Sequence, residues 1–506
     1  MNDREEIQEV SALLRSKVPI ILIETNEEPR ILNLLQQAGN LEQQMLFRWS
    51  IVGGISRFNV EDAIYNTHNL LDALKHIDKT SQNGIYVMCD AHPGFKDPVN
   101  ARLMREIALA HYKKARTLVF ISPRLDDMPS ELLRLAAHFR PRLPTRDEIK
   151  AVISEEAQLW QSQSGEKARG ERAVVDQLVL HLMGLEQDEV RRLVRQALRA
   201  DGEINQDDLR RVLETKHQAL GGADVLGFES SHVKFDQVGG LAQLKHWVHL
   251  RRAPFLESAG ANGVHSDRPK GILLLGVMGG GKSLAARAIA GEWNAPLMRL
   301  DFGALYNKYY GETERNLRSA LAAAEAMSPC VLWIDEMEKG VATAGSGEED
   351  GGVSRHILGT FLTWLADRSK AVFIVATAND IAALPPELIR KGRFDEIFFV
   401  DFPQPAAREQ IFAIHLKKRG LDPAQFAVTT LAQWAEGFSG AEIEQAIIAA
   451  GFEAKARAAQ VTTDDVTAEL KRTRPLSIVM AERIEELRAW VRDRAVMADL
   501  FDDKAH

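Results

Sequence analysis

The chain has 506 residues, of which 45% are apolar, with a formal net charge of −8 and a pI near 6.0. This composition is typical of a globular protein with several domains, and its acidic balance disfavours a nucleic-acid partner. Two cysteines are too few for a disulfide framework or a zinc site. With no apolar run near about 18 residues, and a charged N-terminus, we expect a cytoplasmic protein without a membrane span.

The first half of the chain alternates short apolar runs with helical patterns. Buried strands are predicted at Val18–Ile23, Gly84–Cys89 and Thr117–Ser122. Such alternation predicts a parallel α/β sheet, and we assign residues 1–150 to one α/β domain. A helical region of its own is expected over residues 151–220.

The second half predicts a further α/β domain followed by helices. Its strands are expected at Ile272–Leu275, Leu297–Leu300, Val331–Ile334, Val372–Ala376 and Ile397–Val400. Residues 221–232 are rich in glycine and serine, which predicts a linker. We assign residues 233–403 to the core of this domain. Residues 404–506 are expected to form a helical lid that ends in an amphipathic tail helix.

The clearest motif is GILLLGVMGGGKS, from Gly271 to Ser283. A strand, a glycine loop ending in Gly-Lys-Ser and a helix give the spacing of a phosphate-binding loop. Glycines let backbone N–H groups approach phosphate oxygens, Lys282 can reach the β- and γ-phosphates, and Ser283 can ligate Mg²⁺. The alternative, a glycine-rich turn with an exposed lysine, is disfavoured by the flanking strand and helix. We therefore expect ATP and Mg²⁺ as cofactors, bound through Gly276, Val277, Met278, Gly279, Gly280, Gly281, Lys282, Ser283 and Leu284.

A second motif ends the apolar strand Val331–Ile334 in two acids, 53 residues after Lys282. In a phosphate-loop ATPase the first acid, here Asp335, organises Mg²⁺, and the second, Glu336, polarises the attacking water. Two solvated acids at the end of a strand are common by themselves. The spacing from the glycine loop makes them candidate metal-binding and catalytic residues.

From about Val233 to Val496 these motifs resemble the AAA family of the AAA+ superfamily, in particular the group with aromatic pore loops and paired arginine fingers. The whole chain is also similar to a group of AAA proteins from bacteria and algal plastids. The resemblance implies further nucleotide contacts, from Asp236, Val238 and Gly239 before the first helix, from His415 near the ribose, and from Gly440 and Ala441 in the lid. A lone histidine is as often a core or surface residue.

The same resemblance implies three roles beyond nucleotide binding. Asn379 would orient the attacking water, and Arg390 and Arg393 would reach the nucleotide of a neighbouring subunit in a homo-oligomeric ring, expected to be a hexamer. Tyr309 and Tyr310 would line the central pore, where aromatic rings grip any extended polypeptide. The alternative interpretations are surface salt bridges for the arginines and an ordinary loop for the tyrosines.

Some residues depart from the family pattern. Val277 and Met278 stand where two prolines are usual, and Gly280 where threonine is common, which puts the rigidity of the loop in question. Leu365–Arg368 replaces an Asp-Gly segment that signals between subunits. This replacement puts tight coupling around a ring in question.

The two halves of the chain also resemble each other. TLVFISPRLDDMPSELLR, from Thr117, matches AVFIVATANDIAALPPELIR, from Ala371, in outline. The first copy carries ETNEEP, from Glu24, where a phosphate loop would stand, and its three glutamates would repel phosphate. Its strand ends in Asp90, with Ala91 in the expected place of the catalytic glutamate. We predict a degenerate ATPase-like domain; the alternative is an unrelated α/β domain.

Two functions remain open at this point. The first is a ring-forming, Mg²⁺-dependent ATPase that remodels or threads a protein client, with the first half as an assembly or recruitment module. The second is a nucleotide-gated regulatory or scaffold switch without threading, which the altered segment Leu365–Arg368 favours. A motor on nucleic acid is disfavoured by the acidic balance and by Tyr309 and Tyr310.

Overall fold

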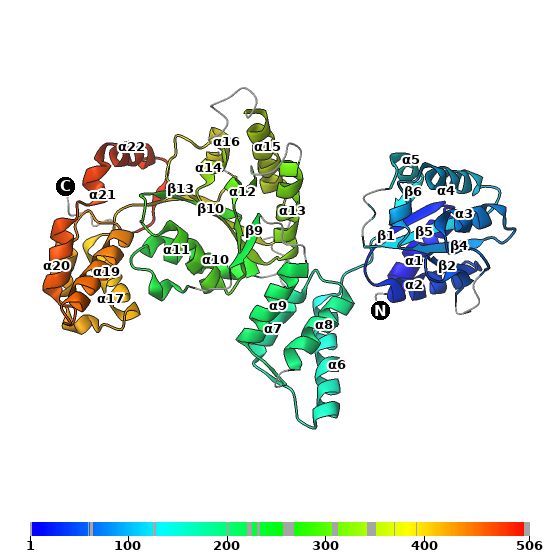
Figure 1. The fold of residues 1–506 in the computed structure, drawn as a ribbon, viewed down its shortest axis with the longest axis horizontal. Coiled ribbons are helices and arrows are strands. Elements are labelled where there is room, and N and C mark those ends of the chain that lie inside the picture. The colour runs from blue at the N-terminus through cyan, green and yellow to red at the C-terminus, as the bar shows by residue number, and fades with distance from the viewer. Residues whose placement is uncertain are drawn as a thin grey trace. The chain divides into compact units, whose positions relative to one another are not determined.

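The computed structural model describes residues 3–58, 60, 64–123, 125, 128–199, 202–219, 225–229, 233–256, 268–305, 312–341, 351–368, 370–390 and 392–499. The chain forms two compact units (Figure 1). The first comprises residues 1–168 and 182–202, and the second comprises residues 169–181 and 203–506. Among the described residues, no helix has the length and apolar character needed to cross a membrane.

Six strands of the first unit form one sheet in the order β3-β2-β4-β5-β1-β6. They are β1 (Ile20–Glu24), β2 (Leu46–Ser50), β3 (Gly54–Arg57), β4 (Gly84–Cys89), β5 (Arg116–Ser122) and β6 (Ala136–His138). Only β3 is antiparallel to its neighbour, and every other pair is parallel. The predicted parallel α/β sheet is therefore confirmed.

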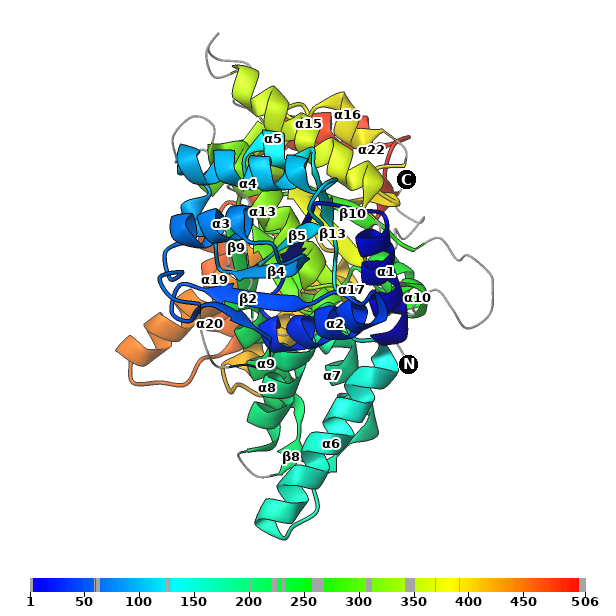
Figure 2. The same ribbon diagram turned by 90° about the vertical axis from the view of Figure 1, so that its right-hand side faces the viewer.

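Alternation along β1 explains how both faces of this sheet are covered. Ile21 and Ile23 join the apolar cluster beneath α1 (Asp3–Arg15) and α2 (Glu28–Leu41), because successive side chains of a strand point to opposite faces. Ile20 and Leu22 join the cluster beneath the second helix pair. That pair is α3 (Leu70–Lys79) and α4 (Pro98–Ala110), and Figure 2 shows the sheet between the two pairs.

The helical region expected over residues 151–220 is divided between the units. The first unit contains α6 (Arg146–Ser164) and α8 (Gln187–Leu198), joined by the buried Glu156, which accepts hydrogen bonds from Arg191 and Arg195 at 3.1 and 2.9 Å. These guanidinium groups lower the pKa of Glu156. The first unit also contains η1 (His92–Gly94) and α5 (Ser130–Leu133). The part of the region that belongs to the second unit comprises β7 (Arg169–Gly170), most of α7 (Arg172–Leu182), β8 (Glu203–Ile204) and α9 (Gln206–Ala219).

The second unit contains a seven-stranded sheet in the order β15-β14-β10-β13-β12-β11-β9. Its strands are β9 (Leu226–Glu229), β10 (Gly271–Gly276), β11 (Leu297–Leu300), β12 (Cys330–Ile334), β13 (Val372–Ala378), β14 (Glu396–Val400) and β15 (Val496–Met497). Two edge strands differ from the sequence expectation. β9 lies within the range expected to be a linker and pairs antiparallel with β11, and β15 lies in the expected tail helix and pairs with β14.

The two sheets share one topology. The first unit has β6-β1-β5-β4-β2 with an antiparallel strand, β3, at the edge, and the second has β14-β10-β13-β12-β11 with an antiparallel strand, β9, at the same edge. The register also agrees, because Gly84 N donates to Ala115 O as Cys330 N donates to Ala371 O. This agreement supports duplication of one fold, although β3 follows β2 in the chain whereas β9 precedes β10.

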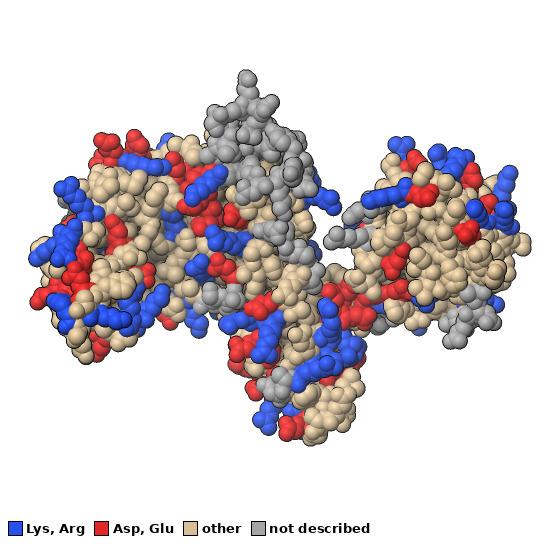
Figure 3. Space-filling model, in the orientation of Figure 1, with Lys and Arg blue, Asp and Glu red and all other residues tan. Residues whose placement is uncertain are grey.

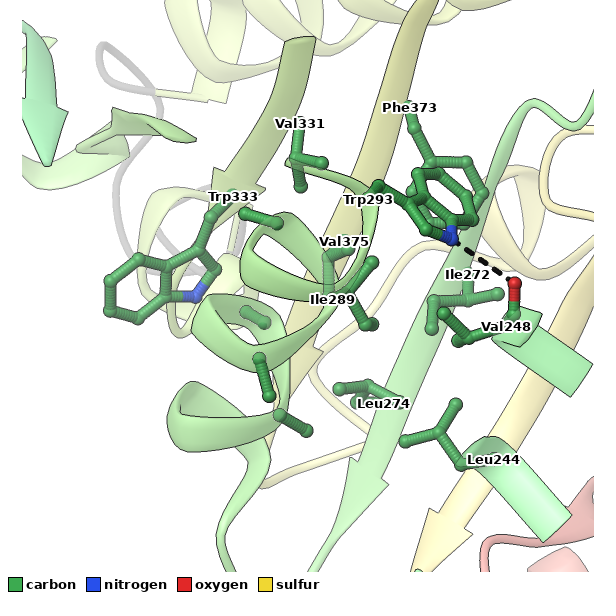
Figure 4. Close-up of a cluster of buried hydrophobic side chains, with 14 of the residues drawn as sticks. Leu244, Val248, Ile272, Leu274, Ile289, Trp293, Val331, Trp333, Phe373 and Val375 are labelled. Atoms are coloured by element: carbon green, nitrogen blue, oxygen red, sulfur yellow. Dashed lines mark hydrogen bonds between the residues drawn. The ribbon is translucent and has the colours of Figure 1, made fainter. Parts of the chain in front are cut away.

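One face of the second sheet packs against α10 (Ala242–Leu256) and α11 (Lys282–Trp293). Trp293 is fully buried there, with its Nε1 donating to Val248 O at 3.1 Å and its ring centroid 4.5 Å from that of Phe373 (Figure 4). The other elements of the core domain are η2 (Phe235–Gln237), α12 (Phe302–Leu305), α13 (Glu312–Ala326), α14 (Met337–Val341), α15 (Gly351–Asp367) and α16 (Pro386–Ile389).

A helical lid follows β14. It consists of α17 (Pro405–Lys418), η4 (Pro423–Gln425), α18 (Val428–Trp434), α19 (Gly440–Ala456) and α20 (Thr463–Arg472), then α21 (Leu476–Val479) and α22 (Ala481–Val491). The first four helices bury a shared apolar cluster that includes Phe412, Leu431 and Ile443. On the face shown in Figure 3, acidic and basic side chains are interspersed over each unit, in line with the small net charge.

Candidate nucleotide site

A cleft of about 570 Å³ opens in the second unit beside the glycine loop. Most predicted site residues line it, namely Val238, Gly239, Met278, Gly279, Gly280, Gly281, Lys282, Ser283, Leu284, Asp335, Glu336, Asn379, His415, Gly440 and Ala441. Asp236, Gly276, Val277, Arg390 and Arg393 do not line it. Tyr309 and Tyr310 lie outside the described residues.

At two positions of the loop, neighbouring atoms lie so close to the backbone that only glycine fits. Gly276 has φ +148°, and a Cβ on it would lie 2.0 Å from Val400 O, so the strand can continue into the loop only without a side chain. Gly279 has φ +72°, and its Cβ would lie 3.0 Å from atoms of Ser439 and Ala441. Ala441 N donates to Gly279 O at 3.2 Å. The start of α19 therefore rests directly on the phosphate loop.

Val277 replaces the proline expected from the family pattern, yet its side chain is held firmly. It is 4% exposed and packs with Phe402 and Ile484, the latter on α22. Since an apolar cluster fixes this end of the loop, the sequence-based doubt about its rigidity applies instead to Met278, which is 45% exposed.

Lys282 lies at the start of α11 and is buried. Its Nζ donates to Gly276 O and Val277 O, each at 2.8 Å, and neither acceptor carries a formal charge. Burial lowers the pKa of Lys282 to about 8, and the nearby carboxylates, with Glu338 the largest, offset this only in part. A buried cation beside a glycine loop at a helix N-terminus suits an anionic phosphate.

The Asp335 carboxylate collects three partners at the end of β12. Ser283 Oγ donates to its Oδ1 at 3.2 Å, Thr377 Oγ1 donates to the same oxygen at 2.7 Å, and Arg299 Nη2 lies 3.8 Å from Oδ2. A hydroxyl and a carboxylate oxygen this close fit Mg²⁺, which takes few protein ligands and otherwise phosphate and water oxygens. This fits the finding that no group of three acidic, histidine or cysteine side chains among the described residues could hold a metal.

Thr377 was not identified from the sequence. Its hydroxyl also accepts from Glu336 N at 3.0 Å, so one side chain connects both acids of the motif. Glu336 has φ +48°, a left-handed conformation that is uncommon for glutamate and often found at functional sites. Its position in the sequence could have indicated it, because Thr377 lies near the carboxyl end of β13, the strand that neighbours β12, and the carboxyl ends of parallel strands meet at one edge.

Asn379 closes the polar edge of the cleft. Its Nδ2 donates to Glu336 Oε1 at 3.4 Å and to Glu338 Oε1 at 3.2 Å, and its backbone N donates to the same Glu338 oxygen at 3.0 Å. Glu336 Oε2 also forms an ion pair with Lys339, which lies on the exposed side of α14. Glu338 was not predicted as a site residue, and it is 8% exposed.

The lid contributes His415 from α17 to the other end of the cleft. Burial lowers the pKa of His415, which favours the uncharged ring. Its Nδ1 lies 3.4 Å from Glu444 Oε1 without forming a hydrogen bond. Glu444 instead accepts from Arg419 Nη2 at 2.9 Å. His415 is therefore available to a nucleotide as an uncharged group.

Arg390 and Arg393 follow α16 and do not line the cleft. Arg390 is exposed, and Arg393 Nη1 donates to Leu362 O at 2.6 Å. β9, by contrast, is tied to the cleft wall, since Glu229 accepts from Arg287 Nε at 2.9 Å and Arg287 lines the cleft.

In the first unit the corresponding loop is occupied by the protein itself. Asn26 N donates to both carboxylate oxygens of Glu186, at 3.2 and 3.3 Å, and Thr25 Oγ1 donates to Oε1 at 2.7 Å. Glu27 Oε1 accepts in return from Asp188 N at 3.1 Å. Glu186 precedes α8 as Ser439 precedes α19. A carboxylate from the lid-like helix thus takes the hydrogen bonds that a phosphate would take in a functional loop.

The shared register corrects the sequence alignment of the first unit by one residue. Since Gly84 corresponds to Cys330, Cys89 stands in the place of Asp335, and Asp90 stands in the place of Glu336. Asp90 also has φ +52°, like Glu336. The expectation that Ala91 replaces the catalytic glutamate is therefore wrong. The metal-binding acid is the one that is missing.

The thiol that replaces the acid is chemically inert. Burial raises the pKa of Cys89 to about 12, so it carries no charge at neutral pH. Arg48, which has the register of Arg299, pairs instead with Glu28 at the start of α2, at 3.1 Å. The first unit has thus kept the arginine and moved the negative charge from the strand to the helix.

Three features define the class of this protein as a P-loop ATPase: the glycine loop between β10 and α11, the two acids that follow β12, one strand removed from β10, and a helical lid over the cleft. Three family models match the chain. The ATPase family associated with various cellular activities (AAA) matches residues 272–402, and the N-terminal and second domains of SpoVK-like AAA ATPases match residues 6–140 and 147–223. The chain therefore belongs to the AAA family and is an ATP hydrolase, which confirms the resemblance drawn from the motifs.

Several relatives are similar over nearly the whole chain. The uncharacterized AAA domain-containing protein ycf46 of Guillardia theta is 36% identical over 488 residues, which cover 96% of this chain and 94% of the relative. Its counterpart in Pyropia yezoensis is 34% identical over 96% of this chain and 97% of the relative. The proteasome-activating nucleotidase of Aeropyrum pernix is 33% identical over 47% of this chain and 59% of the relative.

Proposed function

We propose that the second unit hydrolyses ATP with Mg²⁺ in a homo-oligomeric ring, expected to be a hexamer, and that this drives remodelling or threading of a protein client. In this proposal Lys282 and Ser283 hold the phosphates and the metal, Asp335 organises the metal, and Glu336 polarises the attacking water. Asn379 positions that water. Val238, Gly239, His415, Gly440 and Ala441 contact the nucleoside.

The observation that carries the proposal is the separation of the two arginines from their own cleft. Lys282, Asp335 and Glu336 line one cleft, whereas Arg390 and Arg393 do not line it. A cation is needed near the γ-phosphate to stabilise the charge of the transition state, and supply in trans is a known solution. The arrangement therefore supports a site that is completed between neighbouring subunits.

The test is nucleotide trapping by Glu336→Gln. This variant keeps Lys282 and the loop, so we expect it to bind ATP, to lose turnover and to sediment as a larger species with ATP than without. Lys282→Ala is the matched control and should neither bind ATP nor change its sedimentation. If Glu336→Gln fails to retain ATP, the assignment of the site is incorrect.

The first unit is proposed to be an assembly or recruitment module without nucleotide. Its loop has two residues between Thr25 and α2, whereas the functional loop has five between Gly276 and α11. Glu186 already takes the backbone hydrogen bonds of that loop. Each subunit would then carry one ATPase site.

A nucleotide-gated switch without threading remains the second candidate, favoured by the unusual segment Leu365–Arg368. Arg368 is tied to the base of β10 through a bond from its Nη2 to Lys270 O, and burial lowers its pKa to about 10. Tyr309→Ala separates the two functions. A threading enzyme with this change should hydrolyse ATP yet lose client processing, whereas a switch should work unchanged.

A further inference from the structure

Glu338 is a third carboxylate beside the two acids of the ATPase motif. It lies three residues after Asp335, near the start of α14, and is 8% exposed. Its Oε1 accepts two hydrogen bonds, both from Asn379, while Oε2 is buried and has no hydrogen-bond partner among the described residues. A buried carboxylate with this one protein partner residue is costly unless that contact serves the site.

The contact determines which way the Asn379 amide points. Its Nδ2 faces Glu336 Oε1 at 3.4 Å and Glu338 Oε1 at 3.2 Å. Carboxylate oxygens only accept hydrogen bonds, so the amide nitrogen must face them and Oδ1 must face elsewhere. An asparagine held in this way offers its carbonyl oxygen as an acceptor, which is the group needed to hold a proton of an attacking water.

The backbone is fixed by the same oxygen. Asn379 N donates to Glu338 Oε1 at 3.0 Å, so the chain just after β13 and its side chain are held together. Glu338 therefore connects α14 to the end of β13 through both the backbone and the side chain of Asn379.

We propose that Glu338 is a positioning residue for ATP hydrolysis, which orients Asn379 so that its Oδ1 faces the attacking water. This inference rests on the proposed function of the cleft. Glu338 contacts no reacting atom in it, and its effect on turnover passes through Asn379. Binding of ATP should depend on it little, because the phosphates are held by the loop, Lys282 and Ser283.

The experiment is a double-mutant cycle in the full-length chain with ATP turnover measured at steady state. Glu338→Ala should lower kcat by about tenfold or more, the usual scale for a residue that holds a functional group in place, with KM within about twofold. Glu338→Gln can still present an oxygen to Asn379 and should recover part of that loss. Glu338→Ala combined with Asn379→Ala should be no slower than Asn379→Ala alone, within about twofold.

Glu325→Gln serves as the matched control. Glu325 accepts from Trp364 Nε1 at 2.7 Å, away from the cleft, and a glutamine can keep that bond, so turnover should not change. Full kcat in Glu338→Ala would overturn the inference, as would multiplied losses in the double variant, because independent residues multiply their effects. A loss of ATP trapping by Glu336→Gln would instead contradict the proposed function itself.

Discussion

The hydroxyl of Thr25 donates a 2.7 Å hydrogen bond to the carboxylate of Glu186, 161 residues further along the chain. The bond joins the vestigial phosphate loop of the first unit to the helix that corresponds to α19. In the second unit the equivalent elements meet through Ala441 N and Gly279 O, and beside them the cleft is open. In the first copy a carboxylate of the protein itself thus bonds the loop, whereas in the second copy the loop borders an open cleft.

Removing this carboxylate should loosen the first unit. Glu186→Ala leaves Thr25 Oγ1 and Asn26 N without their acceptor, and hydrogen bonds to a charged group contribute about 1.5–3 kcal/mol. We expect a loss of stability of that size and faster hydrogen exchange at residues 25–28 and at the start of α8. Arg192→Ala, on the exposed face of α8, is the control and should change stability by less than about 0.5 kcal/mol. Unchanged exchange in Glu186→Ala would show that the lid-like helix is held by other contacts.

Thr377 predicts a separate effect on turnover. Thr377→Val keeps the shape of the side chain but removes the hydroxyl that joins Asp335 Oδ1 to Glu336 N. We expect kcat to fall about 10- to 100-fold, the range for partners that orient functional groups. Thr377→Ser retains the hydroxyl and should recover most of the activity. Equal activity of the valine and serine variants would exclude this role, and a thermal melt would detect any general loss of folding.

The sequence was sufficient for the fold class and for most residues around the cleft, because both depend on local patterns. Short apolar runs predicted the strands, and the loop Gly276–Ser283 predicted the phosphate site. The edge strand β9 escaped prediction because its short sequence resembles a loop, and its hydrogen bonds come from β11, which lies some 70 residues later. Pairing between distant segments leaves no local signature.

The residues missed in the site share the same cause. Thr377 and Glu338 act through side chains on neighbouring elements, so they carry no spacing motif of their own. The one-residue error at Asp90 arose because the motif alone aligns acids by type, whereas the strand register aligns them by backbone position. Glu186 was not identified from the sequence either, because a glutamate at the start of a helix is common and nothing local indicates that it bonds a distant loop.

The arginines predict complementation between two inactive variants. Arg390→Ala keeps a complete cleft but lacks the residue for its neighbour, and Lys282→Ala keeps that arginine but lacks nucleotide binding. Each should be nearly inactive alone. Random mixing in equal amounts makes about one interface in four complete, so activity should return to about a quarter of the normal level. A mixture of Arg390→Ala and Arg393→Ala should not recover activity, because no interface in it has both arginines. Full activity of one of these two variants alone would show that the arginine it lacks is not part of the site.

The lowered pKa of Lys282 predicts how the stability of the nucleotide-free protein depends on pH. Its pKa falls from 10.5 to about 8 in the folded chain, chiefly through burial. Between these two values the unfolded chain binds more protons than the folded chain, so the free energy of unfolding should rise with pH across this window through this group. Chemical denaturation of the wild type and of Lys282→Met, at pH 8 and pH 10, measures the difference. A wild type that loses stability relative to the variant over this range would contradict the shift.

The same shift predicts the pH dependence of ATP binding. Above about pH 8 Lys282 is increasingly neutral, and a bound phosphate favours its charged form, so binding must take up a proton. We expect the affinity for ATP to fall by up to about tenfold for each pH unit above 8. Calorimetry at pH 8.5 in two buffers of different ionisation enthalpy should show uptake of up to about one proton. Lys282→Arg carries a group that does not titrate here and should bind with no such uptake, and equal uptake in both proteins would assign the proton to another residue.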